Sequence, residues 1–437
     1  MGSVGRNRAV AILLDPTSRS INSDVVTDGT KYCRCPRLLL PTAETMPLLN
    51  SIPAQVKPLV IVSVATTVVL LSVVSYSHLK RMIPVNTKRL RVKLPKNLAL
   101  WRSPGEDVDD EDSEAIWRTL DPLLRQHGLE QWIYGGLSYL DAPGDSVRMP
   151  RGYAYIGPSR ASGEGNVGTA RSLSRMQYLN ATFRIVRTKD GHDVTVRPIR
   201  LGNEGIEHLR ILRKIATGPL ALLSNNHTLP MAGTIDFEDV TLGIFPLTGN
   251  DMDRAFKFWP KNSVGDVVDM ILQALEGLAF LHEQRIAHRD ANISNFVVEY
   301  HPESLRTMTV ATSRPRVYIV DFETSVAFPE ELPFESCVCV GVPTGETITE
   351  WARALPPEVT SRELYSPFKL DVWQFGYSFT GSYTYRTTIA VIDDILINLV
   401  NDDVGHRPSA KEALSMLRSV VSKMAPIDLL IPPTVTR

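Results

Sequence analysis

The chain has 437 residues, which is enough for a two-lobed catalytic unit with additional segments. A formal net charge of -1 gives no support for a basic nucleic-acid-binding surface, so we expect no nucleic-acid partner. The cysteines lie in two close pairs without a neighbouring histidine cluster, which argues against zinc and favours reduced thiols. These are Cys33, Cys35, Cys337 and Cys339.

The amino-terminal part contains the sharpest break in composition. Residues 1–57 mix charges, prolines and short apolar runs, and we expect a poorly ordered segment there. Residues 58–79 contain no Lys, Arg, Asp or Glu, and an apolar stretch of that length is sufficient for one transmembrane helix. Basic residues cluster after this stretch, which places the rest of the chain in the cytoplasm. The alternatives are a buried core segment or a wrongly assigned gene start.

Residues 80–174 are first basic and then acidic, and we expect a linker that contains one helix at 113–127. Ser113 is a suitable N-cap for this helix, Gly128 is a suitable terminator, and apolar residues recur on one face between them. Residues 157–172 are rich in Gly, Ser and Ala and predict a surface loop.

Residues 175–247 predict a small β-rich lobe. Two strands flank an Asp190-Gly191 turn, a helix follows at 205–216, and a further strand lies at 239–247. Residues 248–423 predict a larger, mainly helical lobe, and 424–437 a tail. The first long helix of the larger lobe is expected at 264–282, where apolar residues recur every three or four positions.

Three polar residues of the second lobe have the types that phosphoryl transfer requires. Asp290 follows the 264–282 helix, Asn295 lies five positions later, and Asp321 ends a buried strand at 317–322. A carboxylate that faces the acceptor hydroxyl and oxygen ligands for Mg²⁺ are the parts that this chemistry needs. We therefore expect Asp290 as the base, and Asn295 and Asp321 as the magnesium ligands.

Five motifs in the expected order resemble the eukaryotic protein kinase family. They are HRDANISN (288–295), VDFE (320–323), PPE (356–358), DVWQFG (371–376) and HRPSAKEAL (406–414). The resemblance implies an α+β, two-lobed kinase-like fold that uses ATP and Mg²⁺ and acts on an unknown protein substrate. It also implies that Glu358 pairs with Arg407 and that Asp371 braces the catalytic loop.

Over about residues 98–423, the chain also resembles the divergent protein-kinase-like proteins of mushroom-type fungi. Strings such as GLAFLHEQRIAHRD and LNATFRIVRTKDGHDVTVR carry this narrower likeness.

The phosphate-binding side departs from the family pattern. No glycine occurs at 175–186, where the Gly-rich loop is expected, and Arg197 stands in the place of the phosphate-binding lysine. Glu207 is the expected helix partner of Arg197, although a strict register would place His208 there. Further changes are Asn292 for a lysine and Glu323 for a glycine.

Two hypotheses follow. The first is a membrane-anchored, ATP-dependent kinase acting on Ser or Thr, in which Asp290, Asn295 and Asp321 are catalytic and Arg197 and Glu207 serve the nucleotide. The second is a pseudokinase that acts as a membrane-tethered scaffold, because several phosphate contacts are altered. A small-molecule phosphotransferase is a third reading, and Arg289 argues against it.

Overall fold

The computed structural model describes the chain over the following ranges: 84–102, 110–136, 139–143, 175–177, 182–248, 251–253, 263–299, 316–345, 348, 351–381, 384–431 and 434–436. From Asn86 to Arg437 these residues belong to one compact unit. The expected membrane segment at 58–79 and the expected surface loop at 157–172 lie outside them. Among the residues described, no helix combines the length and the apolar character that crossing a membrane requires.

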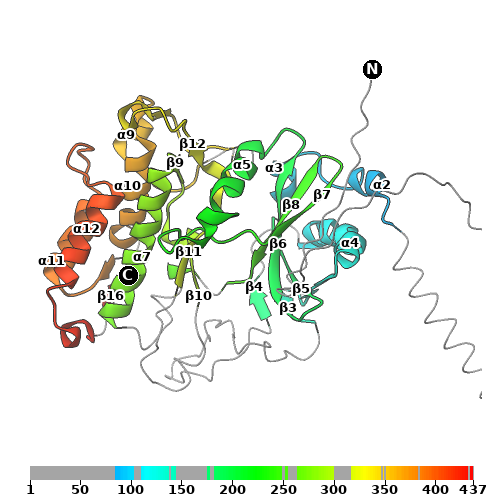
Figure 1. Cartoon of the computed structure of the whole chain (residues 1–437), viewed down its shortest axis with the longest axis horizontal. Helices are drawn as coiled ribbons and strands as arrows, with labels where there is room; N and C mark the ends of the chain where they lie inside the picture. Colours follow the sequence, from blue (N-terminus) through cyan, green and yellow to red (C-terminus); the bar gives the residue numbers. More distant parts are fainter. Residues whose placement is uncertain are drawn as a thin grey trace, which may run out of the picture. The chain divides into compact units, whose positions relative to one another are not determined.

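An antiparallel sheet of five strands forms the centre of the amino lobe, with the order β1-β5-β6-β8-β7. Strands β5, β6, β7 and β8 of this sheet are labelled in Figure 1. The strands are β1 (Leu129–Gln131), β5 (Arg184–Thr188), β6 (Asp193–Leu201), β7 (Gly233–Phe237) and β8 (Val240–Pro246). Strands β5 and β6 pair across the turn that the Asp-Gly signal predicted. Helix α5 (Ile206–Ile215) packs against β6 and buries Leu209 and Leu212.

The segment before β5 belongs to this lobe and is more than a linker. Strand β1 pairs with β5, and helix α4 (Asp110–Gln126) packs against β1 with Trp117 and Leu120 fully buried. The buried Glu114 of α4 forms an ion pair with Arg184 of β5. The amino lobe therefore begins well before residue 175. Our boundary there was too late because β1 is only three residues long and carries no periodic signal.

Two short helices precede α4 and lie against the same lobe. They are α2 (Thr87–Arg91) and α3 (Leu98–Arg102). Arg91 forms an ion pair with Asp239 (Nε to Oδ1 2.5 Å), at the turn between β7 and β8. The Leu98 backbone N–H donates to Glu204 (2.6 Å), and Trp101 is fully buried against Trp117 of α4. This extension is thus attached at several separate points.

Helices dominate the carboxyl lobe, as the sequence predicted. They are α7 (Val264–Glu283), α9 (Pro357–Thr360), α10 (Pro367–Thr380), α11 (Ala390–Asn398) and α12 (Ala410–Val421). Ser263 and Asp266 cap α7 reciprocally, which fixes where the helix begins. Short 3-10 turns are η3 (Pro219–Leu222), η4 (Ile293–Asn295), η5 (Phe322–Thr324), η6 (Phe334–Ser336) and η7 (Pro426–Leu429).

Short strand pairs connect the loops around these helices. The pairs are β9 (Ile286–Ala287) with β12 (Val326–Ala327), β10 (Phe296–Glu299) with β11 (Arg316–Ile319), β13 (Cys339–Val340) with β14 (Leu364–Tyr365), and β15 (Thr384–Arg386) with β16 (Thr434–Thr436). A three-stranded sheet joins β2 (Ile133–Tyr134), β3 (Tyr139–Asp141) and β4 (Arg175–Gln177). Together with the amino-lobe sheet, these elements form a mixed α and β structure that fits a kinase-like fold.

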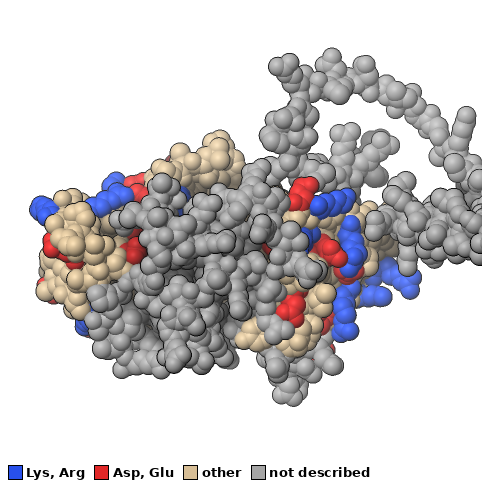
Figure 2. Space-filling model, turned by 90° about the horizontal axis from the view of Figure 1, so that it is seen from below, with Lys and Arg blue, Asp and Glu red and all other residues tan. Residues whose placement is uncertain are grey.

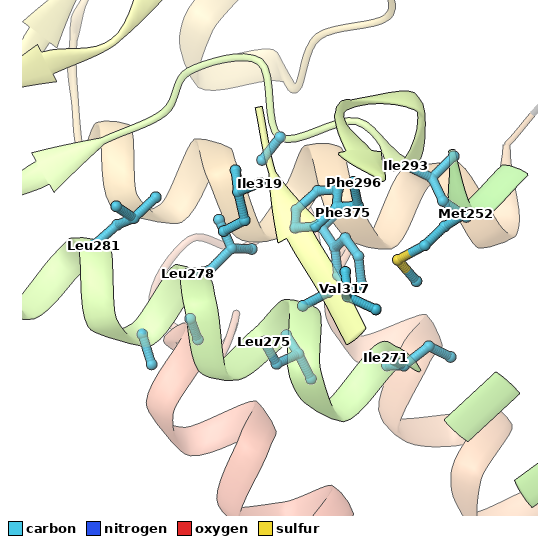
Figure 3. Close-up of a cluster of buried hydrophobic side chains, with 14 of the residues drawn as sticks. Met252, Ile271, Leu275, Leu278, Leu281, Ile293, Phe296, Val317, Ile319 and Phe375 are labelled. Carbon is cyan, nitrogen blue, oxygen red and sulfur yellow. The ribbon is translucent and has the colours of Figure 1, made fainter. Parts of the chain in front are cut away.

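The core of the carboxyl lobe lies directly beneath the loops that carry the candidate site. Val317 and Ile319 of β11 lie over the apolar face of α7, next to Phe296 and Phe375 (Figure 3). All four side chains are fully buried. Burial of this kind stabilises a structure by about 1.5–3 kcal/mol per large side chain. The loops therefore start and end on rigid elements.

A short segment after η3 joins the two lobes through main-chain contacts. The Ile319 N–H of β11 donates to the His227 carbonyl (2.6 Å), and the Leu229 N–H donates to the Ile319 carbonyl (3.1 Å). Gly277 of α7 lies so close that an added Cβ would meet the His227 Cβ at 2.7 Å. The absence of a side chain at Gly277 lets His227 pack against α7 while residues 227 and 229 hydrogen-bond to β11.

Candidate functional site

The loop at 288–295 is held in place by a buried carboxylate from helix α10. Asp371 is fully buried and accepts backbone N–H hydrogen bonds from His288 (2.8 Å) and Arg289 (2.6 Å). It also bonds to the Nε2 of His282 at 2.9 Å. These contacts hold Arg289 in a left-handed conformation, with φ 64°. The expected bracing role of Asp371 is confirmed.

Asp290 lies at the centre of this loop, and neighbouring amides hold its carboxylate. Asn292 Nδ2 donates to Oδ1 at 2.5 Å, and Asn295 Nδ2 donates to Oδ2 at 2.9 Å. Burial raises the pKa of the Asp290 carboxyl, and the charge of Asp321 raises it further, while Arg353 and His288 act in the opposite direction. A base with a raised pKa is better matched to proton transfer near neutral pH.

Asn295 is oriented by the same contacts. Its Nδ2 donates to the Asp290 carboxylate and also to the Asp290 carbonyl (2.8 Å), which fixes which end of the amide is nitrogen. Within the described residues, its Oδ1 takes part in no hydrogen bond. The Asn295 carbonyl accepts from Val320 N (3.0 Å), and the Val320 carbonyl lies 2.9 Å from His288 Nε2. The two loops that carry Asn295 and Asp321 are thus tied together.

Asp321 follows β11 in a left-handed conformation with φ 70°. One carboxylate oxygen, Oδ1, accepts from Arg197 at 2.9 Å, and Oδ2 makes no hydrogen bond within the described part of the chain. Burial opposes its ionisation, but Arg197 and Arg102 outweigh burial and hold the pKa of Asp321 well below its usual range. Asp321 is therefore a carboxylate at any physiological pH.

The oxygens of Asn295 and Asp321 fit the requirements of Mg²⁺. This ion prefers hard oxygen ligands and commonly binds through one or two protein groups plus phosphate oxygens and water. Over the described ranges, no cluster of three or more His, Cys, Asp or Glu side chains forms an all-protein metal site. The donor set suits a magnesium ion that arrives with a nucleotide.

Arg197 projects from β6 towards the loop that contains Asp321. Its Nη2 donates to Asp321 and to Glu323, both of which are acidic residues of the carboxyl lobe. Burial lowers the pKa of the Arg197 guanidinium, but the charges of Asp321 and Glu323 outweigh burial and raise it. The guanidinium is permanently charged and retains Nη1 for a further contact, because no hydrogen bond of the described residues uses that nitrogen.

The structure does not bring Glu207 to Arg197, so the expected pairing is wrong. Glu207 is 47% exposed and forms an ion pair with Arg210 (2.6 Å), one turn along the same helix. His208 is buried in its place, as the strict register required. Burial and the nearby Arg197 lower the pKa of His208 to about 3, so its ring is neutral at pH 7. Helix α5 therefore supplies no anion at this point.

The strand order also changes where a glycine-rich loop is expected. In the five-stranded sheet, the edge strand β1 pairs with β5. The connection between these two strands runs from residue 132 to residue 183 and includes β2, β3 and β4. This connection contains the sequence GEGNVG at 163–168, whose glycine spacing is typical of kinase phosphate loops. Our expectation had placed the loop at 175–186. Residues 163–168 lie outside those that the structure describes.

The segment from η5 to α9 carries a further cation into the site. Arg353 Nη1 lies 3.4 Å from Asp290 Oδ1 and donates to Ser294 Oγ at 3.2 Å. No pattern in the sequence pointed to this residue, because a single arginine in a long irregular segment is common. Arg353 thus places a positive charge near Asp290. Asn292, which stands where the family pattern has a lysine, contributes no charge there.

The expected structural ion pair is confirmed. Arg407 is fully buried, and its Nη1 donates to Glu358 of α9 at 2.6 Å. Two further bonds from its guanidinium reach the Asn401 carbonyl. This pair fixes the end of the segment that carries Arg353.

Comparison with known proteins places these features in a family context. Over 200 residues, the chain is 27% identical to the cell division control protein 2 homolog 3 of Trypanosoma brucei brucei, which covers 45% of this chain and 56% of that protein. A stretch of 115 residues is 31% identical to the serine/threonine-protein kinase oca2 of Schizosaccharomyces pombe, covering 26% and 14% of the two chains. A serine/threonine-protein kinase of equine herpesvirus 1 is 26% identical over 209 residues, or 47% and 46%.

These similarities support a relationship to the protein kinase family. The chain spans about half or less of the length of these relatives. No family model matches the sequence.

Proposed function

We propose that this chain is an ATP-dependent protein kinase that transfers phosphate to serine or threonine hydroxyls of proteins. We further propose, from sequence strings such as GLAFLHEQRIAHRD, that it is related to the divergent kinase-like proteins of mushroom-type fungi. The observation that carries the proposal is the gathering of Asp290, Asn295 and Asp321 on two loops joined by main-chain hydrogen bonds.

Each group has a role that follows from its surroundings. Bound ATP with Mg²⁺ would supply the phosphoryl group and the charge that neutralises it. Asp290, whose raised pKa suits a base, would orient the acceptor hydroxyl and receive its proton. Asn295 Oδ1 and the permanently ionised Asp321 would hold the metal. Arg197 would contact phosphate through the nitrogen that Asp321 and Glu323 leave available.

A specific observation also favours the pseudokinase alternative. Arg197 already has two acidic partners, which offset much of the positive charge that would attract a phosphate. Arginine also presents a planar fork where a lysine would present a point charge, which changes the geometry of the contact. A binding module would keep the fold and lose turnover.

The experiment compares the full-length protein with Asp290→Ala and with Asp402→Ala, an exposed control. Magnesium-dependent ATP binding is measured by thermal shift, and phosphate transfer is measured on generic protein substrates. We expect Asp290→Ala to lose about 10²- to 10⁴-fold in transfer while it keeps nucleotide binding. Binding without any transfer that depends on Asp290 would favour the scaffold. Absence of both binding and transfer in the native protein would reject the kinase proposal and the metal assignments.

We also propose membrane attachment through residues 58–79, with the kinase-like region in the cytoplasm. The charge-free stretch and the basic residues after it support this topology. The protein should resist carbonate extraction from membranes. Recovery in the soluble fraction would remove the anchor and leave the kinase proposal unchanged.

A further inference from the structure

The phosphate-side cation of this site has an unusual set of partners. Arg197 contacts Asp321 and Glu323, and it contacts no acid from helix α5. Glu323 is 7% exposed, and it lies between two guanidinium groups, because Arg102 Nη2 contacts its other oxygen at 2.5 Å. Arg102 is the last residue of helix α3, far away in the sequence. One carboxylate thus connects strand β6, η5 and the amino-terminal extension.

Burial makes this carboxylate costly unless both of its neighbours stay charged. A buried ion is stable only when paired and hydrogen-bonded, and each oxygen of Glu323 has a cationic partner. Removal of either arginine would leave part of that charge uncompensated. The three groups therefore act as a unit, and the position of Arg197 depends on Arg102 through Glu323.

We infer that Glu323 is a positioning residue that holds Arg197 for phosphate, in place of an acid on helix α5, and that helix α3 anchors it through Arg102. This inference rests on the proposed nucleotide binding. Its physical basis is competition for Arg197. When Glu323 holds part of the guanidinium, Asp321 keeps one oxygen for the metal ion. Without Glu323, Arg197 would turn fully onto Asp321 and compete with magnesium.

The attachment of α3 gives the inference a second element. Leu98 donates to Glu204, Trp101 is buried against α4, and Arg91 holds the preceding helix to Asp239. The position of Arg102 is therefore set by contacts outside the site. A force or partner that displaces α3 would remove one of the two cations that hold Glu323.

The test uses the full-length protein and measures affinity for magnesium–ADP by calorimetry, at several magnesium concentrations. For Glu323→Gln, we expect about 10-fold weaker binding and a higher magnesium concentration for half-maximal binding, because a supporting contact of a metal ligand is lost. Arg102→Gln should weaken binding about 3-fold, because its side chain is partly exposed. Glu207→Gln, whose carboxylate lies outside the site, should bind as the native protein does.

A rescue variant separates positioning from general damage. His208 is buried close to Arg197, so His208→Glu in the Glu323→Gln background offers the guanidinium an acid from helix α5. We expect this double variant to recover at least part of the lost affinity. In phosphate transfer, the KM for ATP should rise in Glu323→Gln while kcat changes less. A merely structural role would lower the active fraction and leave KM unchanged.

The outcomes are distinguishable. If the native protein does not bind magnesium–ADP, the proposed function fails. If it binds and Glu323→Gln matches Glu207→Gln, the inference is overturned while the proposed function stands. If Glu323→Gln does not fold, Arg102→Gln decides: unchanged affinity in that variant contradicts the inference, and weaker affinity supports it.

Discussion

The two halves of the candidate site are built by different means. The catalytic loop is held mainly by main-chain groups, which donate to Asp371 and to Asn295 or accept from His288. The phosphate side is held by side-chain ion pairs among Arg197, Asp321 and Glu323. Main-chain contacts do not change with the identity of the donor residue, whereas an ion pair can pass from one acid to another. The catalytic-loop half therefore retains the HRDANISN motif. In the other half, Arg197 pairs with Asp321 and Glu323 in place of an acid on helix α5.

The largest effect should come from the main-chain brace. Asp371→Asn replaces an acceptor by a group that repels some of the N–H donors of His282, His288 and Arg289, and it does so at a fully buried position. We expect the free energy of unfolding to fall by about 3 kcal/mol. Phosphate transfer should fall by about 10²-fold, because the loop is displaced. Urea unfolding and a transfer assay measure the two effects, and the exposed Asp394→Asn serves as the control. An unaltered stability would show that the brace is dispensable.

The buried ion pair at the end of the segment should affect stability more than chemistry. Glu358→Gln leaves the fully buried Arg407 without its acidic partner, and we expect a loss of about 2 kcal/mol in the free energy of unfolding. Below the unfolding temperature, nucleotide affinity should not change. Thermal unfolding and calorimetry test these two statements. Loss of affinity in a folded variant would mean that this pair belongs to the site.

A substitution of Arg353 tests whether a cation from the segment between η5 and α9 supports the function of Asp290. Arg353→Gln should lower kcat about 10-fold, because the cation beside Asp290 is lost. Arg353 lowers the pKa of Asp290, so its removal should raise that pKa and move the acidic limb of the pH–rate profile to higher pH. Arg386→Gln, a substitution outside the site, is the control. A profile that stays in place would assign Arg353 to substrate contact alone.

The smallest effect should come from the neutral histidine of the phosphate side. His208 has a pKa of about 3 in the folded protein, below its ordinary value of 6.5, because burial, Arg197 and His288 lower the pKa more than Asp321 raises it. The unfolded chain therefore binds more protons between these values, and stability is lost as the pH falls below about 6.5. The slope is at most about 1.4 kcal/mol per pH unit for one group.

His208→Gln should remove this contribution, so the variant should lose less stability than the native protein between pH 6 and pH 4. Urea unfolding at several pH values measures the difference. Equal slopes in the two proteins would show that His208 is protonated in the folded state, and a partner acid would then have to be found.

The sequence predicted that Asp290 and Asn295 lie close together, and the reason is physical. Asp290 and Asn295 lie in one short loop, and their spacing fixes their relation with little help from the rest of the chain. Helices α4, α5 and α7 were confirmed because their apolar periods are long. Strands β5 and β6 were confirmed because the Asp-Gly turn between them is a strong hairpin signal, and β8 was confirmed as well.

The phosphate half could not be predicted in the same way. The contact between Arg197 and Glu323 joins residues 126 positions apart, and no local pattern encodes it. His208, and not Glu207, faces the site from helix α5. The two positions differ by one residue, which corresponds to a rotation of about 100° around a helix. Strand β1 was not predicted because it has only three residues and is followed by a long connection.

The segment at 226–229 connects the amino lobe to strand β11 of the carboxyl lobe. It is hydrogen-bonded to the N–H and the carbonyl of Ile319, two residues before Asp321, and His227 packs closely against Gly277. Pulling the lobes apart at this point would break main-chain hydrogen bonds that shield the core. These bonds therefore attach the end of the amino lobe to the strand that leads directly into Asp321.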